Sequence, residues 1–363
     1  MRSLALALTA ITLAGALATT CAPRGSTTQP LAGHPAPTGS PALADAGSRD
    51  VSLTPDDAAG AGSSPSSDAA PKLVLSLVSD CVPPQPPAAG TIEEALDVEW
   101  GTMGAQPQKL DIAWPKVKGP HPLVILIHGG GWTAGHKGLF RDVIRLLAGQ
   151  GYVAATLGYR LASKAKNVFP AAIEDVRCSL RFLRAHAADY QLDPKRVVAI
   201  GASAGGHLAA LLATASDHIG FDAPCPHKGQ PVTISGAISY YGPLELRDAA
   251  SRYVPKMQQA VEEFLGDKSE TVPAKAALAT PITHVDPRDP PVLTIHGNAD
   301  TIVPIDDSRR FDKALAAASV PHLLVEIDGG KHGFPVLGKG SKVRPATCTA
   351  MAFLRAVTQS AAP

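Results

Sequence analysis

The sequence has little net charge and few aromatic side chains, and it lacks any metal-binding spacing. The 33 basic residues balance 32 acidic ones, leaving a formal net charge of +1, which favours neither nucleic acid nor an anionic membrane surface as a partner. Aromatic residues make up only 5% of the chain and offer no platform for stacking nucleic-acid bases. No cysteine or histidine pair has the spacing of a metal site, and the sequence contains no internal repeat. We therefore expect no nucleic-acid partner and no bound metal.

Large apolar side chains are nearly absent from residues 22–71, a segment rich in Ala, Ser, Thr, Pro and Gly. Such a segment buries too little surface to offset the entropy lost on ordering. Residues 81–90 are rich in proline. We therefore predict a disordered tether over residues 22–90, followed by one catalytic domain over residues 91–363.

The first 21 residues are typical of an export signal. Arg2 precedes an uncharged apolar stretch, residues 4–18, which is too short to span a bilayer comfortably. Residues 16–18 form a small-x-small cleavage site. Cys21 offers an alternative, because a lipoprotein signal places a cysteine just after the apolar stretch to receive a lipid. The sequence leaves open whether the protein is secreted, periplasmic or membrane-anchored through Cys21.

Four other cysteines are present: Cys81, Cys178, Cys225 and Cys348. In an oxidising compartment they allow up to two disulfides, whose pairing the sequence does not assign. Cys178 lies in a segment of strong helical periodicity, and we expect it to be buried and unpaired.

Within the predicted domain, short apolar runs alternate with segments of helical periodicity. Strands are predicted at 123–127, 152–157, 197–200, 235–240, 291–296 and 322–327, and helices at 139–147, 170–183 and 207–213. Strands that alternate with helices predict an α/β fold with a mostly parallel, doubly wound sheet and helices on both faces. In such sheets the sites form at the carboxyl ends of the strands.

One polar, helical segment, residues 244–281, interrupts this alternation. Within it an amphipathic stripe is formed by Val254, Met257, Val261, Phe264 and Leu265. This stripe fits either a surface helix that packs on the core or a small cap over the pocket.

A candidate nucleophile elbow lies between a β-branched strand and a helix, at Gly201-Ala202-Ser203-Ala204-Gly205. A serine in such a strained turn points its hydroxyl into the cleft, and the flanking glycines let the neighbouring backbone approach closely. We identify Ser203 as the nucleophile.

A glycine-rich segment, residues 128–132, follows the first of these predicted strands and reads His-Gly-Gly-Gly-Trp. Its glycines permit unusual dihedral angles, so that backbone N–H groups can converge on one point. A developing oxyanion needs such donors fixed in advance. We assign the oxyanion hole to the N–H groups of Gly130, Gly131 and Ala204, with Gly129 as an alternative to either glycine.

A serine hydroxyl is a poor nucleophile unless a base takes its proton. His332 follows the last predicted strand in a glycine-flanked loop, where this fold carries its base, whereas His322 lies at the other end of that strand. Structural or exposed roles are expected for the other histidines, including His207, His284 and His296.

The imidazole in turn needs an acid that fixes its tautomer. Asp300 follows the strand predicted at 291–296 and should emerge beside His332. Other acidic residues lie farther along the chain or at the wrong end of that strand: Asp286, Asp289, Asp306 and Asp307. The order Ser203, Asp300, His332 is the order of an α/β-hydrolase triad.

Taken together, these segments resemble the esterase branch of the α/β-hydrolase superfamily, which includes the hormone-sensitive-lipase-like esterases, and more closely the feruloyl- and acetylxylan-esterase-like group. Further matching segments are 159–161, 169–172 with Asp175, 193–196, 241–243 and 303–304. Hormone-sensitive-lipase-like members usually carry Asp before the tyrosine matched by Tyr159, where Gly158 stands here. The resemblance implies the α/β-hydrolase fold. We assign Trp132 and Tyr241 to the substrate pocket, with packing in the core as the alternative for Trp132.

We therefore predict a serine carboxylesterase that acts on small or carbohydrate-linked esters through an acyl-enzyme, without metal or organic cofactor. Ser203 would attack the carbonyl, His332 would transfer the proton and Asp300 would orient His332. A peptidase or an arylformamidase on the same scaffold is an alternative, although a prolyl-oligopeptidase-type enzyme usually carries a propeller and no repeat is present. A non-catalytic binding protein is a further alternative, but such proteins typically lose members of the triad.

Overall fold

The computed structural model describes residues 73, 75–163, 165–222 and 224–359. The predicted export signal, Cys21 and most of the predicted tether lie outside these residues. Residues Asp68–Pro363 form one compact unit. Among the described residues, none of the helices has the length and apolar character needed to cross a membrane.

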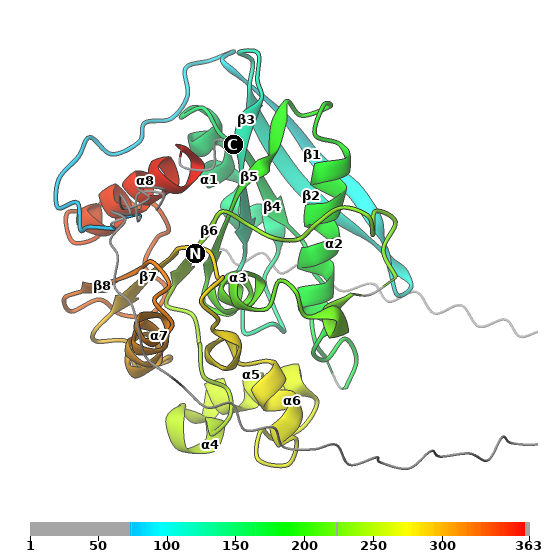
Figure 1. Ribbon diagram of the computed structural model, residues 1–363, viewed down its shortest axis with the longest axis vertical. Helices are drawn as coiled ribbons and strands as arrows, with labels where there is room; N and C mark the ends of the chain where they lie inside the picture. Colours follow the sequence, from blue (N-terminus) through cyan, green and yellow to red (C-terminus); the bar gives the residue numbers. More distant parts are fainter. Residues whose placement is uncertain (1–72, 74, 164, 223, 360–363) are drawn as a thin grey trace, which may run out of the picture. The chain divides into compact units, whose positions relative to one another are not determined.

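The unit is built on one eight-stranded sheet (Figure 1). The strands are β1 (Ile92–Met103), β2 (Gln106–Pro115), β3 (His121–Ile127), β4 (Val153–Leu157), β5 (Leu192–Ala202), β6 (Gly236–Tyr240), β7 (Val292–Gly297) and β8 (His322–Ile327), in the spatial order β1-β2-β4-β3-β5-β6-β7-β8. Strands β3 to β8 pair in parallel, and β1 and β2 extend the sheet in antiparallel fashion. The six parallel strands are those that the sequence predicted.

The helices lie on both faces of the sheet, as expected. They are α1 (Arg141–Ala148), α2 (Ala171–Ala185), α3 (Ala204–Thr214), α4 (Ala249–Arg252), α5 (Pro255–Leu265), α6 (Pro273–Leu278), α7 (Asp306–Ala317) and α8 (Arg344–Gln359), with short 3₁₀ turns η1 (Lys137–Phe140), η2 (Ile219–Phe221) and η3 (Pro281–His284). Along β3, Leu123 and Ile125 share a core with residues of α2 and α3, whereas Val124 shares a core with residues of α1 and α8. This two-sided burial confirms the α/β-hydrolase fold.

The amphipathic stripe of residues 244–281 packs on the core. Its members Met257, Val261, Phe264 and Leu265 are buried on α5, and Val254 is partly exposed just before that helix. Other residues of α5 line a pocket described below. The segment is therefore both a helix that packs on the core and a wall of the pocket, so the two interpretations of the sequence are compatible.

The packed part of the chain starts before the predicted boundary at residue 91. Leu73 and Leu75 pack against the core, and the N–H of Val78 donates to Thr349 Oγ1 at 3.0 Å. A disulfide joins Cys81 to Cys348 on α8. Residues 75–88 form neither helix nor strand. Their composition is that of a tether, but the disulfide and the tertiary contacts hold this segment against the domain.

The expectation that Cys178 is unpaired was wrong. Cys178 is buried on α2, but it forms a disulfide with Cys225, 47 residues farther along the chain. Helical periodicity correctly indicated that Cys178 faces inward. The periodicity carries no information on the loop after η2, which brings Cys225 beside Cys178.

Because two histidines are buried, we expect the folded protein to lose stability in mild acid. Burial lowers the pKa of His128 and of His207 from 6.5 to about 4. Between these pH values the unfolded chain binds protons that the folded chain excludes, so stability is highest above pH 6.5 and falls as the pH approaches 4. We expect each histidine to lower the free energy of unfolding by up to about 3 kcal/mol over this window.

Urea denaturation at pH 7.0 and pH 4.5 measures this loss. His207→Gln should show a smaller difference between the two pH values than the wild type. An unchanged pH dependence in His207→Gln would contradict the assignment.

Candidate active site

Ser203 lies at a strained turn between β5 and α3, with φ of 54° and ψ of −122°. The turn requires glycine on both sides, because the backbone passes very close to itself. A Cβ atom on Gly201 would lie 1.9 Å from the carbonyl oxygen of Gly205, and a Cβ atom on Gly205 would lie 1.9 Å from that of Ile127. The chain therefore folds locally as a nucleophile elbow that presents the Ser203 hydroxyl at the carboxyl end of the sheet.

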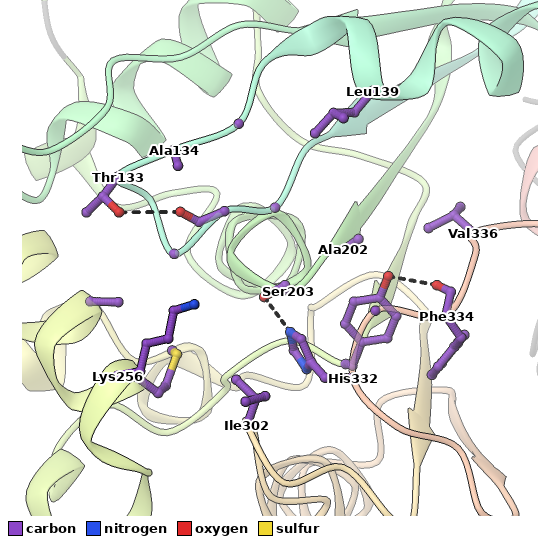
Figure 2. A pocket seen from close by; sticks show the side chains of 18 of the residues that line it. Thr133, Ala134, Leu139, Ala202, Ser203, Lys256, Ile302, His332, Phe334 and Val336 are labelled. Carbon is purple, nitrogen blue, oxygen red and sulfur yellow. Dashed lines mark hydrogen bonds between the residues drawn. The ribbon is translucent and has the colours of Figure 1, made fainter. Parts of the chain in front are cut away.

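The structure brings the three predicted catalytic side chains together. His332 Nε2 lies 2.9 Å from Ser203 Oγ, and His332 Nδ1 lies 2.7 Å from Asp300 Oδ2. The serine follows β5, the aspartate follows β7 and the histidine follows β8, so three parallel strands of one sheet place all three residues at the same edge. Figure 2 shows the Ser203–His332 hydrogen bond at the centre of the pocket.

The side chain of Asp300 is fully buried and accepts hydrogen bonds at both oxygens. Its Oδ2 faces His332 Nδ1 and His296 Nε2, and its Oδ1 accepts from the backbone N–H groups of Ile302 at 2.8 Å and Val303 at 3.0 Å. Burial acts to raise the pKa of Asp300, but hydrogen bonds from His296 and His332 outweigh it and hold the pKa well below its usual range. The carboxylate is therefore charged at neutral pH and fixes the proton of His332 on Nδ1, which leaves Nε2 free to accept the serine proton.

His296 contributes to this site more than the sequence analysis assigned to it. Its buried Nε2 faces two acceptors, Asp300 Oδ2 at 3.2 Å and the carbonyl oxygen of Val303 at 3.0 Å, so Nε2 carries a proton. Its Nδ1 then accepts from the hydroxyl of Ser308 at 2.6 Å. The position of His296 at the end of a strand, four residues before Asp300, was the available signal for this contact.

The glycine-rich loop offers free backbone donors beside Ser203. Gly130 and Gly131 have φ values of 122° and 59°, which a non-glycine residue would adopt only under strain. Among the residues that the structure describes, the N–H groups of Gly130, Gly131 and Ala204 have no acceptor. The two glycines line the pocket with Ser203, and Ala204 begins a helix, whose first N–H groups are unsatisfied. Gly129 also lines the pocket, and among the described residues its N–H has no acceptor, although its φ is not positive. The choice among the glycines therefore stays a prediction.

The pocket around Ser203 has a volume of about 900 Å³ and two chemically different walls. The polar wall is formed by Thr133 and by the α5 residues Lys256, Gln259 and Glu263. The apolar wall is formed by Leu139, Phe140, Val143, Phe334, Pro335 and Val336. Figure 2 shows Thr133 and Lys256 on one side of Ser203, and Leu139, Phe334 and Val336 on the other.

Of the two residues predicted to line the pocket, Tyr241 does so and Trp132 does not. Tyr241 lines the pocket, its hydroxyl donates to the carbonyl oxygen of Phe334 at 2.9 Å, and its ring packs edge-on against His332. Trp132 does not line the pocket, and this part of the prediction was wrong. Its indole is fully buried, stacks on Phe264 and donates to His207 Nδ1 at 3.2 Å, so the core satisfies both its apolar surface and its N–H group.

A family model described as BD-FAE matches residues 110–315 of this chain. The matched region contains the elbow and Asp300 and ends before His332.

Two curated relatives come from Mycobacterium tuberculosis. One is described as a probable carboxylic ester hydrolase, LipM, and is 28% identical over 67% of this chain; the other is esterase LipC, 29% identical over 67% of the chain. The alignments span 56% and 60% of these relatives, so this chain covers only part of their length.

Solved structures share the fold. A thermophilic esterase from Thermogutta terrifontis with bound propionate is 28% identical, with a TM-score of 0.59, and the match covers 74% of this chain and 94% of that one. A truncated carbohydrate esterase from gut microbiota has a TM-score of 0.64, covering 76% of this chain and all of that one. At 22% identity, the second comparison supports the fold alone.

Proposed function

The chain belongs to the BD-FAE family, and from this premise we propose that it is a serine carboxylesterase. The proposal is carried by one observation: an unbroken hydrogen-bond chain runs from Ser203 through His332 to Asp300 at the floor of a pocket. The esterase descriptions of the M. tuberculosis relatives support ester bonds as the target. This geometry is that of acyl transfer by an activated serine.

The proposed reaction proceeds in two halves. His332 Nε2 takes the proton of Ser203 as its Oγ attacks the ester carbonyl, and the N–H groups of the glycine loop and Ala204 stabilise the oxyanion. His332 then donates the proton to the leaving alcohol, and an acyl-enzyme remains. Water, deprotonated by His332, attacks the acyl-enzyme. The bond to Oγ breaks, the carboxylic acid leaves and His332 returns the proton to Ser203 Oγ. The charge on Asp300 stabilises the imidazolium in both halves.

The polar and apolar walls of the pocket favour, as substrate, an ester with one polar part and one less polar part. Thr133, Gln259 and Glu263 present hydroxyl, amide and carboxylate groups that can bind the hydroxyls of a carbohydrate-linked ester. The apolar wall favours an aliphatic or aromatic group instead. We therefore propose small or carbohydrate-linked carboxylic esters as substrates.

Gln259→Leu tests the role of the polar wall. The substitution keeps the size of the side chain and removes its hydrogen-bonding groups, so we expect kcat/KM for an acetylated sugar to fall by about 3- to 10-fold, the effect of one lost hydrogen bond. We expect a smaller change for 4-nitrophenyl acetate, which lacks sugar hydroxyls. Equal losses on both substrates would show that Gln259 does not contact the sugar.

Labelling with a fluorophosphonate probe tests the proposed function directly. The activated serine of a serine hydrolase attacks the phosphorus and retains the probe, whereas a non-catalytic binding protein does not react. Labelling of the wild type together with turnover on a panel of carboxylic esters, amides and formamides supports an esterase. Faster turnover of amides or formamides than of any ester would instead favour a peptidase or an arylformamidase.

We also propose that the protein is exported. The disulfides Cys81–Cys348 and Cys178–Cys225 fit an oxidising compartment. Fatty-acid labelling in the producing cell distinguishes the two routes: label that is lost in Cys21→Ser indicates a lipid anchor, and a protein found in the medium without label indicates secretion. Unlabelled protein that stays in the cytoplasm with reduced cysteines would refute export.

A further inference from the structure

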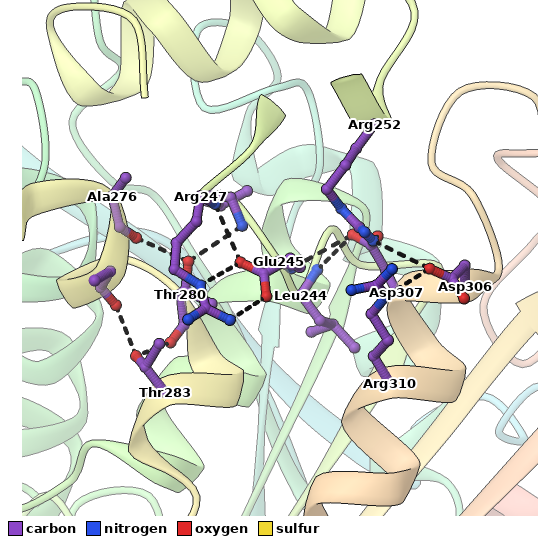
Figure 3. Close-up of polar contacts among 12 residues, drawn as sticks. Leu244, Glu245, Arg247, Arg252, Ala276, Thr280, Thr283, Asp306, Asp307 and Arg310 are labelled. Carbon is purple, nitrogen blue, oxygen red and sulfur yellow. Dashed lines mark hydrogen bonds and ion pairs between the residues drawn. The ribbon is translucent and has the colours of Figure 1, made fainter. Parts of the chain in front are cut away.

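The buried carboxylate of Asp307, in the first turn of helix α7, binds residues that precede helix α5 (Figure 3). Asp307 is fully buried and forms an ion pair with Arg252, and the Tyr253 hydroxyl lies 2.5 Å from Asp307 Oδ2. The backbone N–H of Leu244 also donates to Oδ2, at 3.1 Å. Arg252 and Tyr253 stand two or three residues before α5, the helix that supplies the polar wall of the pocket.

Ser308, the residue next to Asp307, is linked through His296 to the proposed catalytic acid, Asp300. Ser308 Oγ donates to His296 Nδ1 at 2.6 Å, and both side chains are fully buried. His296 Nε2 in turn faces Asp300, which binds His332. Two consecutive residues in one helical turn therefore contact, on one side, the segment before the pocket-lining helix α5 and, on the other, His296, which faces the carboxylate of Asp300.

We propose that Asp307 and Ser308 are positioning residues with separate effects, Asp307 on the size of ester that the pocket accepts and Ser308 on the rate of the chemical step. This inference rests on the proposed esterase function. Asp307 holds α5 at a fixed distance from Ile302, a pocket residue on the loop that leads into α7. Ser308 fixes the ring of His296, and with it the carboxylate of Asp300.

The experiment compares Asp307→Asn with Asp306→Asn over two series of esters, one that grows on the acyl side and one that grows on the alcohol side. Asp306 is the matched control, because it precedes Asp307 directly and its close partner is Arg310 at 2.6 Å, with both side chains 55% exposed. Its carboxylate also lies 3.6 Å from Arg252, and the closer ion pair between Arg252 and Asp307 stays intact in Asp306→Asn. In Asp307→Asn we expect KM for the largest ester of at least one series to rise by about 10-fold, and KM for the smallest ester to change by less than about 2-fold. Asp306→Asn should match the wild type throughout.

Ser308→Ala is expected to give the opposite pattern. It leaves α5 in place but removes the donor to His296, so we expect kcat to fall by about 5- to 10-fold on every ester, with unchanged KM values and no dependence on substrate size. Its rate of fluorophosphonate labelling should fall by the same factor. Because labelling needs no ester, this measurement separates failure of the inference from failure of the proposed function.

The inference is overturned if Asp307→Asn behaves as Asp306→Asn does, or if it lowers kcat equally for all sizes of ester. It is also overturned if Ser308→Ala keeps the kcat of the wild type. Should Asp307→Asn fail to fold, Tyr253→Phe decides the point, because it removes a single hydroxyl, which contacts the same carboxylate and the carbonyl oxygen of Glu245. That variant should shift KM in the same direction, and an unchanged size dependence would refute the role of the contact.

Discussion

Replacing Ser203 with alanine is expected to lower kcat/KM by about 10⁴-fold or more on every ester that the wild type hydrolyses. In the proposed mechanism the substitution removes the atom that forms the acyl-enzyme, while the proposed oxyanion donors and the pocket remain. The residual rate would come from those donors alone. Initial rates with 4-nitrophenyl acetate, together with complete loss of fluorophosphonate labelling, measure the effect.

The Ser203→Ala variant should keep the fold of the wild type. Among the described residues, the side chain of Ser203 bonds only to His332, whereas its backbone N–H donates to the carbonyl oxygen of Tyr240 and its carbonyl oxygen accepts from the backbone N–H of His207. Alanine preserves both backbone contacts, so we expect the free energy of unfolding to change by less than about 1 kcal/mol. Ser251→Ala, at an exposed serine of α4, serves as the control. Substantial turnover in Ser203→Ala would show that the nucleophile lies elsewhere.

The triad could be predicted because each member follows a buried strand that the sequence marks clearly. Parallel strands have their carboxyl ends at one edge of the sheet, so the loops after β5, β7 and β8 had to lie near one another. The local sequence of each loop then indicated which of its residues belongs to the triad. The triad therefore depended on short-range patterns and a topological rule, both of which a single sequence contains.

The features that the sequence did not predict depend on contacts between distant segments. The pairing of Cys81 with Cys348 spans 267 residues, and nothing near either cysteine specifies its partner. Trp132 packs on Phe264 and His207, residues that only the folded chain brings to it. Strand β1 was missed for a different reason: two register shifts against β2 break the alternation of buried and exposed residues that identifies a strand.

Replacing Asp300 with asparagine is expected to lower kcat by about 10³- to 10⁴-fold while KM changes little. Asparagine has the shape of aspartate but replaces one oxygen with an NH₂ group, which can only donate. At the position of Oδ1 this group would meet the N–H groups of Ile302 and Val303, and backbone donors cannot become acceptors. At the position of Oδ2 it would meet His332 and His296, whose imidazole rings can move a proton to their other nitrogen.

The amide nitrogen of the substituted side chain should therefore turn toward the histidines, and His332 should then carry its proton on Nε2. In that tautomer Nε2 faces Ser203 as a donor and cannot take the serine proton, so the chemical step slows although the substrate still binds. Asp328→Asn is the control, because that exposed carboxylate lies after the neighbouring strand β8 and, within the described part of the chain, accepts only from Asn298. Steady-state kinetics of both variants decide the matter. A kcat for Asp300→Asn close to that of the wild type would mean that another group fixes the tautomer of His332, and the buried carboxylate would then have only a structural role.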